Sequence, residues 1–413
     1  MDPLSRRRIL SAGAAASVSA ASLAAARQAV AHAASLPAPS RQPGMGGTDP
    51  GPGDPVRAGQ NPDMLNPPAT DHGTLPNLRF SFADAHMRQT DGGWTRQATV
   101  RELGVSKNIA GVNMRLNKGS AREMHWHKEA EWAFMLYGSA RISAIDADGR
   151  NFIDDVHEGD LWFFPSGIPH SIQGLGDDGC EFLLVFDDGA FDEDSTFLIS
   201  DWFRHVPPGV LAKNFRVPAD NFGHTPDPDK RYIFPLPLPG PLPADRPSNP
   251  QGTVPNPYSF RMTAMTPKSM PGGTVRIVDS TNFKVATTIA SALVEIEPGG
   301  VRELHWHPTA DEWQYYISGE ARMGVFGSSG NARTFDYRAG DVGYVPFAMG
   351  HYIENTGKDT LRFLEMFKSD RFADISLNQW MALTPPELVR GHLDLSDAVM
   401  GALDKVKHPV LPG

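Results

Sequence analysis

Short runs in which hydrophobic and polar residues alternate recur along most of the chain, with Gly, Pro and Asp residues between them. Examples are residues 132–136, 140–144, 161–164 and 182–186. Successive side chains of a strand point to opposite faces, so such runs indicate strands with one buried face. Many short strands at this spacing are typical of an antiparallel sandwich or barrel. We therefore expect a mainly β protein.

Two stretches depart from this pattern and are expected to be helical. The first comprises residues 200–205 and 209–214, and the second comprises residues 377–383 and 386–392. We expect each pair to form a helical tail that packs against a neighbouring domain or subunit.

The two halves of the chain repeat one another. Arg122 and Arg302 lie 180 positions apart, inside matching segments that span residues 109–175 and 289–355. Self-similarity at this period indicates a duplicated domain rather than a solenoid. The sequence therefore predicts two tandem domains with one fold.

The copies differ in length after their last repeated histidine. His170 matches His351 at an offset of 181 positions, whereas Trp202 matches Trp380 at an offset of 178. The first copy therefore carries three extra residues in this part of the chain. The surplus falls around residues 192–196.

Composition suggests where the domains begin and end. Residues 34–75 are rich in Pro, Gly, Ser and Ala, which predicts a linker or extended arm, and residues 236–257 form a second, Pro-rich linker. We accordingly assign the first domain to residues 76–235 and the second domain to residues 258–413.

Residues 1–33 have the pattern of an export signal. Arg6, Arg7 and Arg8 precede a small apolar run, and a small-residue cleavage site ends at Ala33. Consecutive arginines before a weakly hydrophobic run resemble a twin-arginine signal, with a Sec signal as the alternative. We expect an exported protein, periplasmic or secreted. The chain has no other run of about 18 apolar residues, so we expect no membrane span.

Charge and cysteine content exclude several classes of function. The 38 basic and 48 acidic residues give a formal net charge of −10, and no long basic run is present, so we expect no nucleic-acid partner. Cys180 is the single cysteine of the sequence, which excludes a disulfide framework and a thiolate metal cluster. We expect this residue to be a small buried side chain.

Histidine and glutamate residues at repeated positions predict two metal sites. Residues i and i+2 of a strand face the same side, so His125 and His127 present two imidazoles together. The candidate ligands are His125, His127, Glu131 and His170 in the first copy, and His305, His307, Glu312 and His351 in the second. Nitrogen and oxygen donors without thiolate favour Mn, Fe, Ni, Cu or Zn, and the pattern does not choose among them.

The pattern of Gly, His-x-His, Glu, Gly and later Gly-Asp, Pro and His occurs twice, and it resembles the cupin signature. Arg-Glu-Met-His-Trp-His-Lys-Glu-Ala-Glu-Trp from Arg122 and Arg-Glu-Leu-His-Trp-His-Pro from Arg302 look like the bicupin oxalate decarboxylases. The likeness runs from about Gln60 to Pro409. It implies two double-stranded β-helix (jelly-roll) barrels, with an arm before the first barrel completing the second.

The resemblance also implies an activity, its cofactors and an assembly. The expected reaction is decarboxylation of oxalate to formate and carbon dioxide, with one Mn in each barrel and dioxygen as a cocatalyst. The expected assembly is a homo-oligomer, a trimer or a pair of trimers forming a hexamer.

In the first copy, Arg122 is expected to hold a substrate carboxylate, and Glu193 is expected to shuttle the proton from a mobile lid. The lid sequence in the family is typically Ser-Glu-Asn-Ser-Thr, and here it is Asp-Glu-Asp-Ser-Thr from Asp192 to Thr196. Lids without the glutamate resemble those of oxalate oxidases, which produce hydrogen peroxide. Retention of Glu193 favours a decarboxylase, and an oxidase is the alternative.

The second copy keeps Arg302, and Glu365 stands where the family has a second acid near the metal. It lacks the longer lid, so we expect a supporting role in structure or electron transfer, with independent turnover as the rival. Trp126 and Trp306 should point away from the metals. Packing is one interpretation of these tryptophans, and a stacked pair carrying electrons between domains is the other. A storage bicupin of the seed-globulin type and another cupin enzyme are the remaining alternatives.

Overall fold

The computed structural model describes residues 54–64, 66–227 and 232–413. The chain divides into two compact units, Met1–Asn66 and Pro67–Gly413, and each is considered by itself. In the first unit, α2 (Pro55–Gln60) is capped by the Asp54 side chain and is followed by the 3-10 turn η2 (Pro62–Met64). The export signal predicted for residues 1–33 lies outside the described residues.

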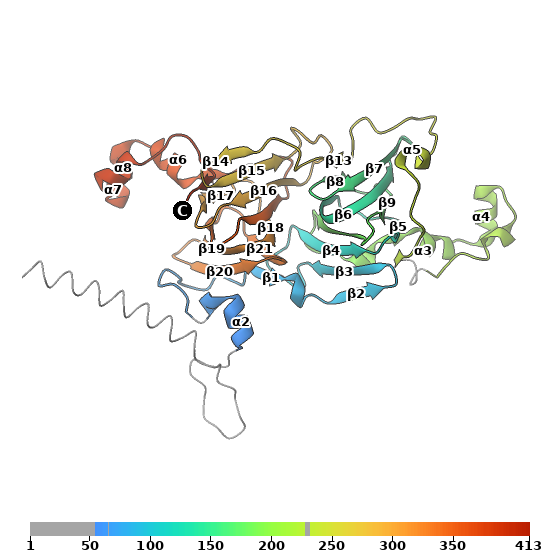
Figure 1. The fold of residues 1–413 in the computed structure, drawn as a ribbon, viewed down its shortest axis with the longest axis horizontal. Coiled ribbons are helices and arrows are strands. Elements are labelled where there is room, and N and C mark those ends of the chain that lie inside the picture. The colour runs from blue at the N-terminus through green and yellow to red at the C-terminus, as the bar shows by residue number, and fades with distance from the viewer. Residues whose placement is uncertain (1–53, 65, 228–231) are drawn as a thin grey trace, which may run out of the picture. The chain divides into compact units, whose positions relative to one another are not determined.

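The unit Pro67–Gly413 contains two antiparallel barrels, which confirms the mainly β prediction (Figure 1). The first barrel is built from β2 (Met87–Thr90), β3 (Gly93–Ala98), β4 (Ala110–Leu116), β5 (Ala121–Trp126), β6 (Glu131–Ile145), β7 (Asn151–His157), β8 (Leu161–Phe164), β9 (His170–Gly174) and β10 (Cys180–Phe186). The predicted strands 132–136 and 140–144 are parts of the single strand β6. Gly138, with a φ of 75°, lies between them and lets this strand turn from one face of the barrel to the other.

The second barrel repeats this arrangement in two sheets. Its strands are β14 (Lys268–Met270), β15 (Gly273–Val278), β16 (Ala290–Ile296), β17 (Val301–Trp306), β18 (Glu312–Ser318), β19 (Glu320–Phe326), β20 (Ala332–Arg338), β21 (Asp341–Val345), β22 (Gly350–Asn355) and β23 (Leu361–Phe367). Here the counterpart of β6 is divided into β18 and β19 at Gly319, whose φ is 92°.

Strand pairing crosses the predicted domain boundaries in both directions. The strand β1 (Arg79–Ser81) precedes the 3-10 turn η3 (Phe82–Asp84) and pairs with β21 of the second barrel. Asp71 accepts a 2.7 Å hydrogen bond from the Thr334 hydroxyl, which ties the preceding segment to the same barrel. The strand β13 (Ser259–Phe260) pairs with β8 of the first barrel. The segment before the first barrel therefore completes the second barrel, in agreement with the expectation for the arm.

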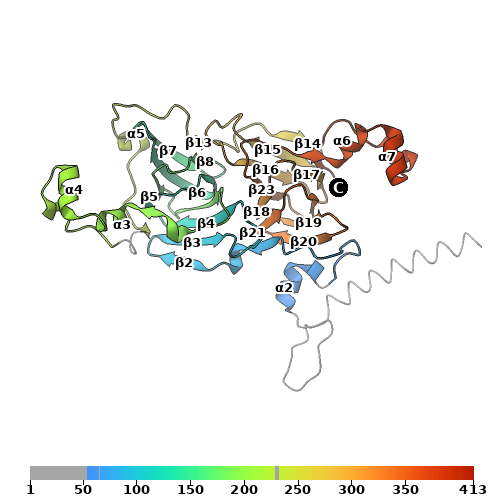
Figure 2. The ribbon, with the colours of Figure 1, turned by 180° about the vertical axis from the view of Figure 1, so that it is seen from behind.

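Helical tails follow both barrels, as predicted. The first contains the 3-10 turn η4 (Glu193–Ser195), β11 (Phe197–Leu198), α3 (Ile199–Arg204), α4 (Pro208–Phe215) and η5 (Ala219–Phe222), and the second contains β24 (Ile375–Ser376), α6 (Leu377–Ala382), α7 (Pro386–Leu393) and α8 (Asp397–Gly401). The four helices that match the prediction begin and end within one residue of it. Figure 2 shows α4 and α7 at opposite ends of the pair of barrels.

Each tail returns to its own barrel through a short strand. The strand β12 (Ile233–Phe234) pairs with β5, and β25 (Val410–Leu411) pairs with β17. The Pro-rich linker includes α5 (Leu242–Asp245), where Asp245 accepts a 2.7 Å hydrogen bond from Arg141 of the first barrel.

Three large apolar cores, with a smaller fourth cluster, are buried in the described part of the unit. One fills the first barrel and includes Cys180, as expected, and another fills the second barrel. The third lies between the barrels and joins Trp132 and Phe134 of β6 to Trp313 and Tyr315 of β18. Because strand side chains alternate, each of these two strands sends one set of residues into its own barrel and the other set into the shared core.

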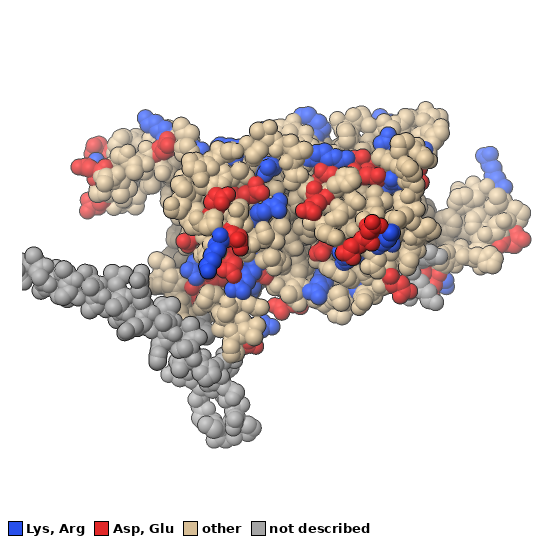
Figure 3. All heavy atoms as spheres, in the orientation of Figure 1, with Lys and Arg blue, Asp and Glu red and all other residues tan. Residues whose placement is uncertain are grey.

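The outer surface carries charges of both signs. Figure 3 shows Lys and Arg side chains interspersed with Asp and Glu on one face, without a large region of a single sign. Among the described residues, no helix is long and apolar enough to span a membrane.

Packing at the shared core gives a stability prediction. A Cβ added at Gly111 would lie 2.4 Å from the Trp313 ring, which is fully buried and has no room to move. We expect Gly111→Ala to destabilise the protein by about 1–3 kcal/mol through overpacking. Gly104→Ala is the matched control, because its added Cβ would meet nothing within 4 Å. Thermal unfolding of both variants checks this, and equal melting temperatures would contradict it.

Candidate metal centres and lid

The structure brings the four candidate ligands of the first copy together. His125 lies on β5 directly opposite His170 at the start of β9, while His127 follows β5 and Glu131 begins β6. All four side chains are buried, and their candidate ligand atoms lie within 4.8 Å of one another. Sheet register therefore places donors from three strands around a single point.

The second copy reproduces this arrangement. His305 on β17 faces His351 on β22, and Glu312 begins β18. With His307, these residues form a second buried group whose ligand atoms also lie within 4.8 Å of one another. All eight residues singled out from the sequence thus fall into two groups of four.

Backbone carbonyl groups fix the orientation of every imidazole. Each Nδ1 atom lies within hydrogen-bond distance of a carbonyl oxygen, which leaves Nε2 to face the centre of the group. The partners are Glu123 for His125 (2.6 Å), Glu129 for His127 (2.7 Å), Ile168 for His170 (2.8 Å), Glu303 for His305 (2.6 Å), Ala373 for His307 (2.8 Å) and Met349 for His351 (3.1 Å). A neutral imidazole held this way presents a lone pair to a metal ion.

The charge state of the first group also suits a cation. Burial alone would raise the pKa of Glu131, but the His170 and His127 imidazoles outweigh it and hold that pKa well below its ordinary value. Burial, together with the nearby Arg122 charge, lowers the pKa of His125. The site therefore offers a carboxylate and a neutral imidazole at neutral pH.

Buried polar atoms without hydrogen bonds indicate what is bound. The Nε2 atoms of His170, His305, His307 and His351 are buried and make no hydrogen bond in the described structure, although carboxylate oxygens lie close by. For His351 that oxygen, of Glu312, is 2.7 Å away. Buried polar groups are otherwise almost always satisfied, so these atoms fit a shared metal ion. The chain is a metal-binding protein with two sites.

Arg122 lies beside the first group and is almost completely buried. Its Nη2 atom donates to the hydroxyl of Thr196 at 3.0 Å and to the carboxylate of Glu193 at 3.3 Å. Its Nε and Nη1 atoms have no hydrogen-bond partner in the described structure. Nε and Nη1 lie on different edges of the guanidinium, so these two unpaired donors can each donate to a separate oxygen atom of a bound ligand.

Glu193 belongs to a segment that is longer in the first copy. Ten residues, 187–196, connect β10 to β11, whereas seven residues, 368–374, connect β23 to β24. This places the three extra residues where the sequence predicts them. The segment folds over Arg122, and the buried Tyr232 hydroxyl donates a hydrogen bond to Glu193. Burial, followed by the charge of Glu193, raises the pKa of Tyr232, which therefore remains a protonated donor.

The matching arginine of the second copy has different partners. Arg302 Nη2 donates to Asp374 at 2.7 Å, and its Nε atom donates to Glu365 at 3.2 Å. Lys407 also contacts Asp374. Burial raises the pKa of Glu365 to about 7, although Arg302 opposes this effect. Asp374 occupies the place that the neutral Thr196 holds in the first copy. The positive charge of Arg302 is therefore compensated by carboxylates of the protein itself.

The ligand carboxylates also differ in what supports them. In the first copy, the indole nitrogen of Trp162 donates to Glu131 at 3.0 Å. In the second copy, the Gln314 side chain donates to Glu312 at 2.8 Å and accepts a hydrogen bond from Tyr316. A Cβ at Gly343 would lie 2.3 Å from the Gln314 side-chain oxygen, so this glycine makes room for the amide. Because different groups donate hydrogen bonds to Glu131 and Glu312, we expect the two metal ions to differ in their chemical properties.

Tyr232 and Asp374 are functional candidates that the sequence analysis does not identify. Tyr232 enters the site because β12 pairs with β5, a long-range contact that no local pattern signals. Its counterpart in the second copy is Pro409, so the repeat gives no signal either. Asp374 could have been found by aligning the two tails, because it matches Thr196 at the same offset of 178 as the paired tryptophans.

Trp126 and Trp306 pack against their own tails. Trp126 stacks on Phe197 and meets Trp202 edge to face, and Trp306 meets Trp380 edge to face at 5.6 Å. Within one chain, these contacts fit the packing interpretation.

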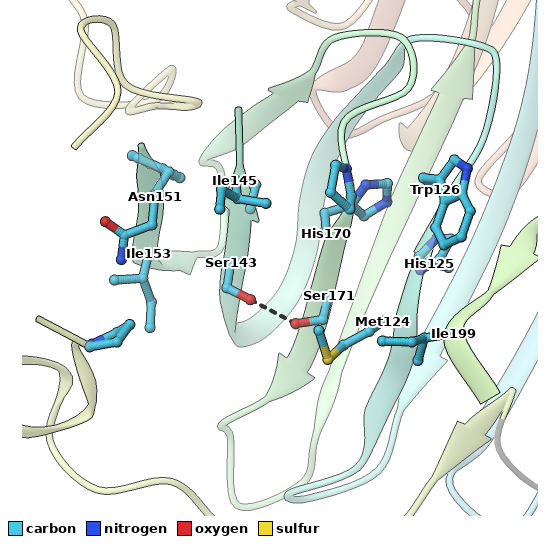
Figure 4. A pocket seen from close by; sticks show the side chains of 14 residues that line it. Met124, His125, Trp126, Ser143, Ile145, Asn151, Ile153, His170, Ser171 and Ile199 are labelled. Atoms are coloured by element: carbon cyan, nitrogen blue, oxygen red, sulfur yellow. Dashed lines mark hydrogen bonds between the residues drawn. The ribbon is translucent and has the colours of Figure 1, made fainter. Parts of the chain in front are cut away.

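An apolar hollow of about 230 Å³ lies on the outer side of β5 and β9 (Figure 4). Met124 and Trp126 line it and alternate with His125 along β5. The hydroxyl groups of Ser143 and Ser171 are hydrogen-bonded at 2.7 Å along its wall. His125 and His170 also line the hollow, so it adjoins the first group of candidate ligands.

The ligand sets give a prediction on metal content. We expect His127→Ala and His307→Ala each to lower bound metal from two ions per chain to one, because each removes one of four ligands from a single site. Elemental analysis of the purified variants measures this. His157→Ala, at an exposed strand end, is the control and should retain both ions. Loss of both ions in either ligand variant would contradict independent sites.

Comparisons with known proteins agree with this geometry. The cupin family matches residues 81–221 and 264–400. The chain is 60% identical over 352 residues to oxalate decarboxylase OxdC of Bacillus subtilis strain 168, covering 85% of this chain and 91% of that protein. It is 44% identical over 357 residues to a probable oxalate decarboxylase of the fungus Arthroderma benhamiae, covering 85% and 87% respectively.

Solved structures extend the comparison to three dimensions. A structure of the Bacillus subtilis enzyme from a study of its Mn(II) centres superposes with a TM-score of 0.86 at 56% identity, covering 92% of this chain and all of that one. A structure of that enzyme at pH 4.6 gives a TM-score of 0.85 at 57% identity, with coverage of 90% and 97%. With two cupin barrels, two intact metal sites and this degree of identity, the chain belongs to the bicupin oxalate decarboxylase family.

Proposed function

We propose that this protein converts oxalate to formate and carbon dioxide at the first metal site, with Mn in both sites and dioxygen as a cocatalyst. The observation that carries the proposal is the buried Arg122 guanidinium. It has two unpaired donors, and it lies between a metal ligand set and the Glu193 lid. The names of the relatives and the Mn(II) centres of the Bacillus subtilis enzyme support the substrate and the metal.

The chemistry requires help because oxalate has a strong carbon–carbon bond and no electron sink of its own. The three imidazoles and Glu131 would hold Mn, which with dioxygen would supply a Lewis acid and a transient one-electron oxidant. Arg122 holds one substrate carboxylate by charge-assisted hydrogen bonds and keeps its orientation constant.

Glu193 acts first as the proton acceptor and then as the proton donor. It accepts the acidic proton of the hydrogen oxalate monoanion, the carbon–carbon bond breaks, carbon dioxide leaves, and Glu193 returns the proton to the carbon that becomes formate. Atoms balance, and no net oxidation occurs. The closed lid brings Glu193 within 3.3 Å of Arg122 and excludes bulk water, since only 6% of the Glu193 surface is exposed.

An oxidase is the alternative reaction of such a site, and it differs in the fate of the proton. Without a donor over the substrate, the fragment left after carbon dioxide departs would be oxidised rather than protonated, and dioxygen would become hydrogen peroxide. The presence of Glu193 on the closed lid favours formate.

The second site is proposed to have a supporting role. Arg302 is already paired with Glu365 and Asp374, so an oxalate dianion entering there would have to displace internal carboxylates. The seven-residue connection also offers no counterpart of Glu193. We propose that this site contributes to stability or electron transfer.

The two complete ligand sets also argue against a storage protein.

We expect Glu193→Gln to reduce formate production at least about 100-fold, because a positioned acid-base group contributes 10²–10⁴-fold. The assay incubates metal-analysed protein with oxalate at acid pH and quantifies formate and peroxide together. Glu158→Gln, on an exposed turn, is the control and should behave as the parent protein. If Glu193→Gln keeps full formate production, either the second site turns over or the proton donor is misassigned. His307→Ala in the same background separates these two explanations.

We also propose that the protein is exported and assembles as trimers paired into hexamers. Trp202, Trp380, Leu383 and Leu388 on the two tails are more than half exposed in the single chain, and burial of such side chains favours association. Light scattering should give a mass three or six times that of the protomer. Leu383→Asp combined with Leu388→Asp should lower it, and an unchanged mass would argue against contacts through the end of α6 and through α7.

A further inference from the structure

The two lid residues that depart from the family sequence each have a partner in the barrel. Asp194 Oδ1 lies 2.6 Å from Nη1 of Arg88, and Asp192 Oδ2 lies 2.8 Å from Nη2 of Arg101. Arg88 is on β2, and Arg101 is in the turn after β3, so both arginines belong to the barrel wall and not to the lid. The ion pairs therefore join the lid to the barrel on either side of Glu193.

Arg88 also contacts Tyr232, the residue that hydrogen-bonds to the proposed proton donor Glu193. Its guanidinium carbon lies 3.7 Å from the ring centroid of Tyr232, and the Tyr232 hydroxyl donates to Glu193. The guanidinium of Arg122 lies over the same ring at 4.1 Å. Arg88 therefore contacts the lid directly at Asp194 and also contacts Tyr232, a residue outside the lid that hydrogen-bonds to Glu193.

We propose that Asp192 and Asp194 form a two-point electrostatic latch that keeps the lid closed, with Arg101 and Arg88 as positioning residues. The latch raises the fraction of time that Glu193 spends over Arg122, and this fraction sets the ratio of formate to peroxide. The last statement rests on the proposed decarboxylation, whereas the closure of the lid by the latch does not.

The solvent exposure of the pairs limits their strength. The side chain of Asp194 is 77% exposed and that of Asp192 is 28% exposed, so each pair should change the ratio of closed to open lid by about two- to five-fold. Such a change is small for global stability. It is large for a segment that opens and closes in each turnover, and exposed ion pairs should weaken as salt screens them.

The substitutions that test the latch remove charge and little else. Asp192 Oδ1 also accepts a hydrogen bond from the Asp194 backbone at 3.1 Å, and an asparagine can keep that cap. We therefore choose Asp192→Asn, Asp194→Asn and the double variant. Asp177→Asn is the matched control, because Asp177 forms a 2.6 Å exposed pair with Lys118 on the turn between β9 and β10, outside the lid.

The first readout is amide hydrogen exchange over residues 189–198 in the Mn-loaded protein without oxalate. We expect exchange in the double variant to be about 4- to 25-fold faster than in the parent, the product of the two single effects. About 0.5 M NaCl should accelerate exchange in the parent but not in the double variant. Equal exchange in the parent and the double variant at low salt would overturn the latch.

The second readout is the ratio of formate to peroxide during turnover. The ratio should be lower than in the parent in Asp194→Asn and in Arg88→Gln. It should be higher in Arg88→Lys than in Arg88→Gln, and it should equal the parental value in Asp177→Asn. Faster lid exchange with an unchanged ratio would overturn the link to reaction outcome. A parent protein that makes no formate from oxalate would instead contradict the proposed function, and the exchange result would still decide the latch.

Discussion

The structure depends on holding three imidazoles and one carboxylate around a point inside a dry barrel. Burial of these groups is unfavourable unless each polar atom has a partner. The barrel meets this demand by giving every imidazole a backbone carbonyl at Nδ1, so that Nε2 atoms converge with the carboxylate. The register of β5 with β9, and of β17 with β22, fixes that convergence. The pairing of these strands therefore determines the geometry of the site.

Much of this arrangement could be predicted from the sequence because it depends on local periodicity and on the repeat. Alternation on a strand places His125 beside His127, and the duplicated spacing identifies all eight ligands without any coordinates. The three surplus residues near Glu193 follow from counting offsets, and the structure places them in the connection that covers Arg122.

Contacts between distant segments could not be predicted in the same way. The sequence shows that Asp192 and Asp194 are unusual, but not that Arg101 and Arg88 lie opposite them. Tyr232 reaches Glu193 only through the pairing of β12 with β5. The strands β1 and β13 each pair with the barrel on the other side of a predicted domain boundary. Residues 79–81, predicted in the first domain, pair with β21 of the second barrel, and β13 pairs with β8 of the first. Each of these depends on tertiary register, which local patterns do not encode.

The two matching arginines differ in how the fold compensates their charge. A buried guanidinium is costly unless its charge is compensated and its donors are satisfied. In the second barrel, Glu365 and Asp374 provide compensation within the chain, so Arg302 is stable without a ligand. In the first barrel, Thr196 replaces the second carboxylate, and two donors of Arg122 remain unpaired. On the proposed function, a small dicarboxylate that completes those hydrogen bonds would relieve the cost, and part of the affinity for substrate would arise from an arginine left incompletely satisfied by the fold.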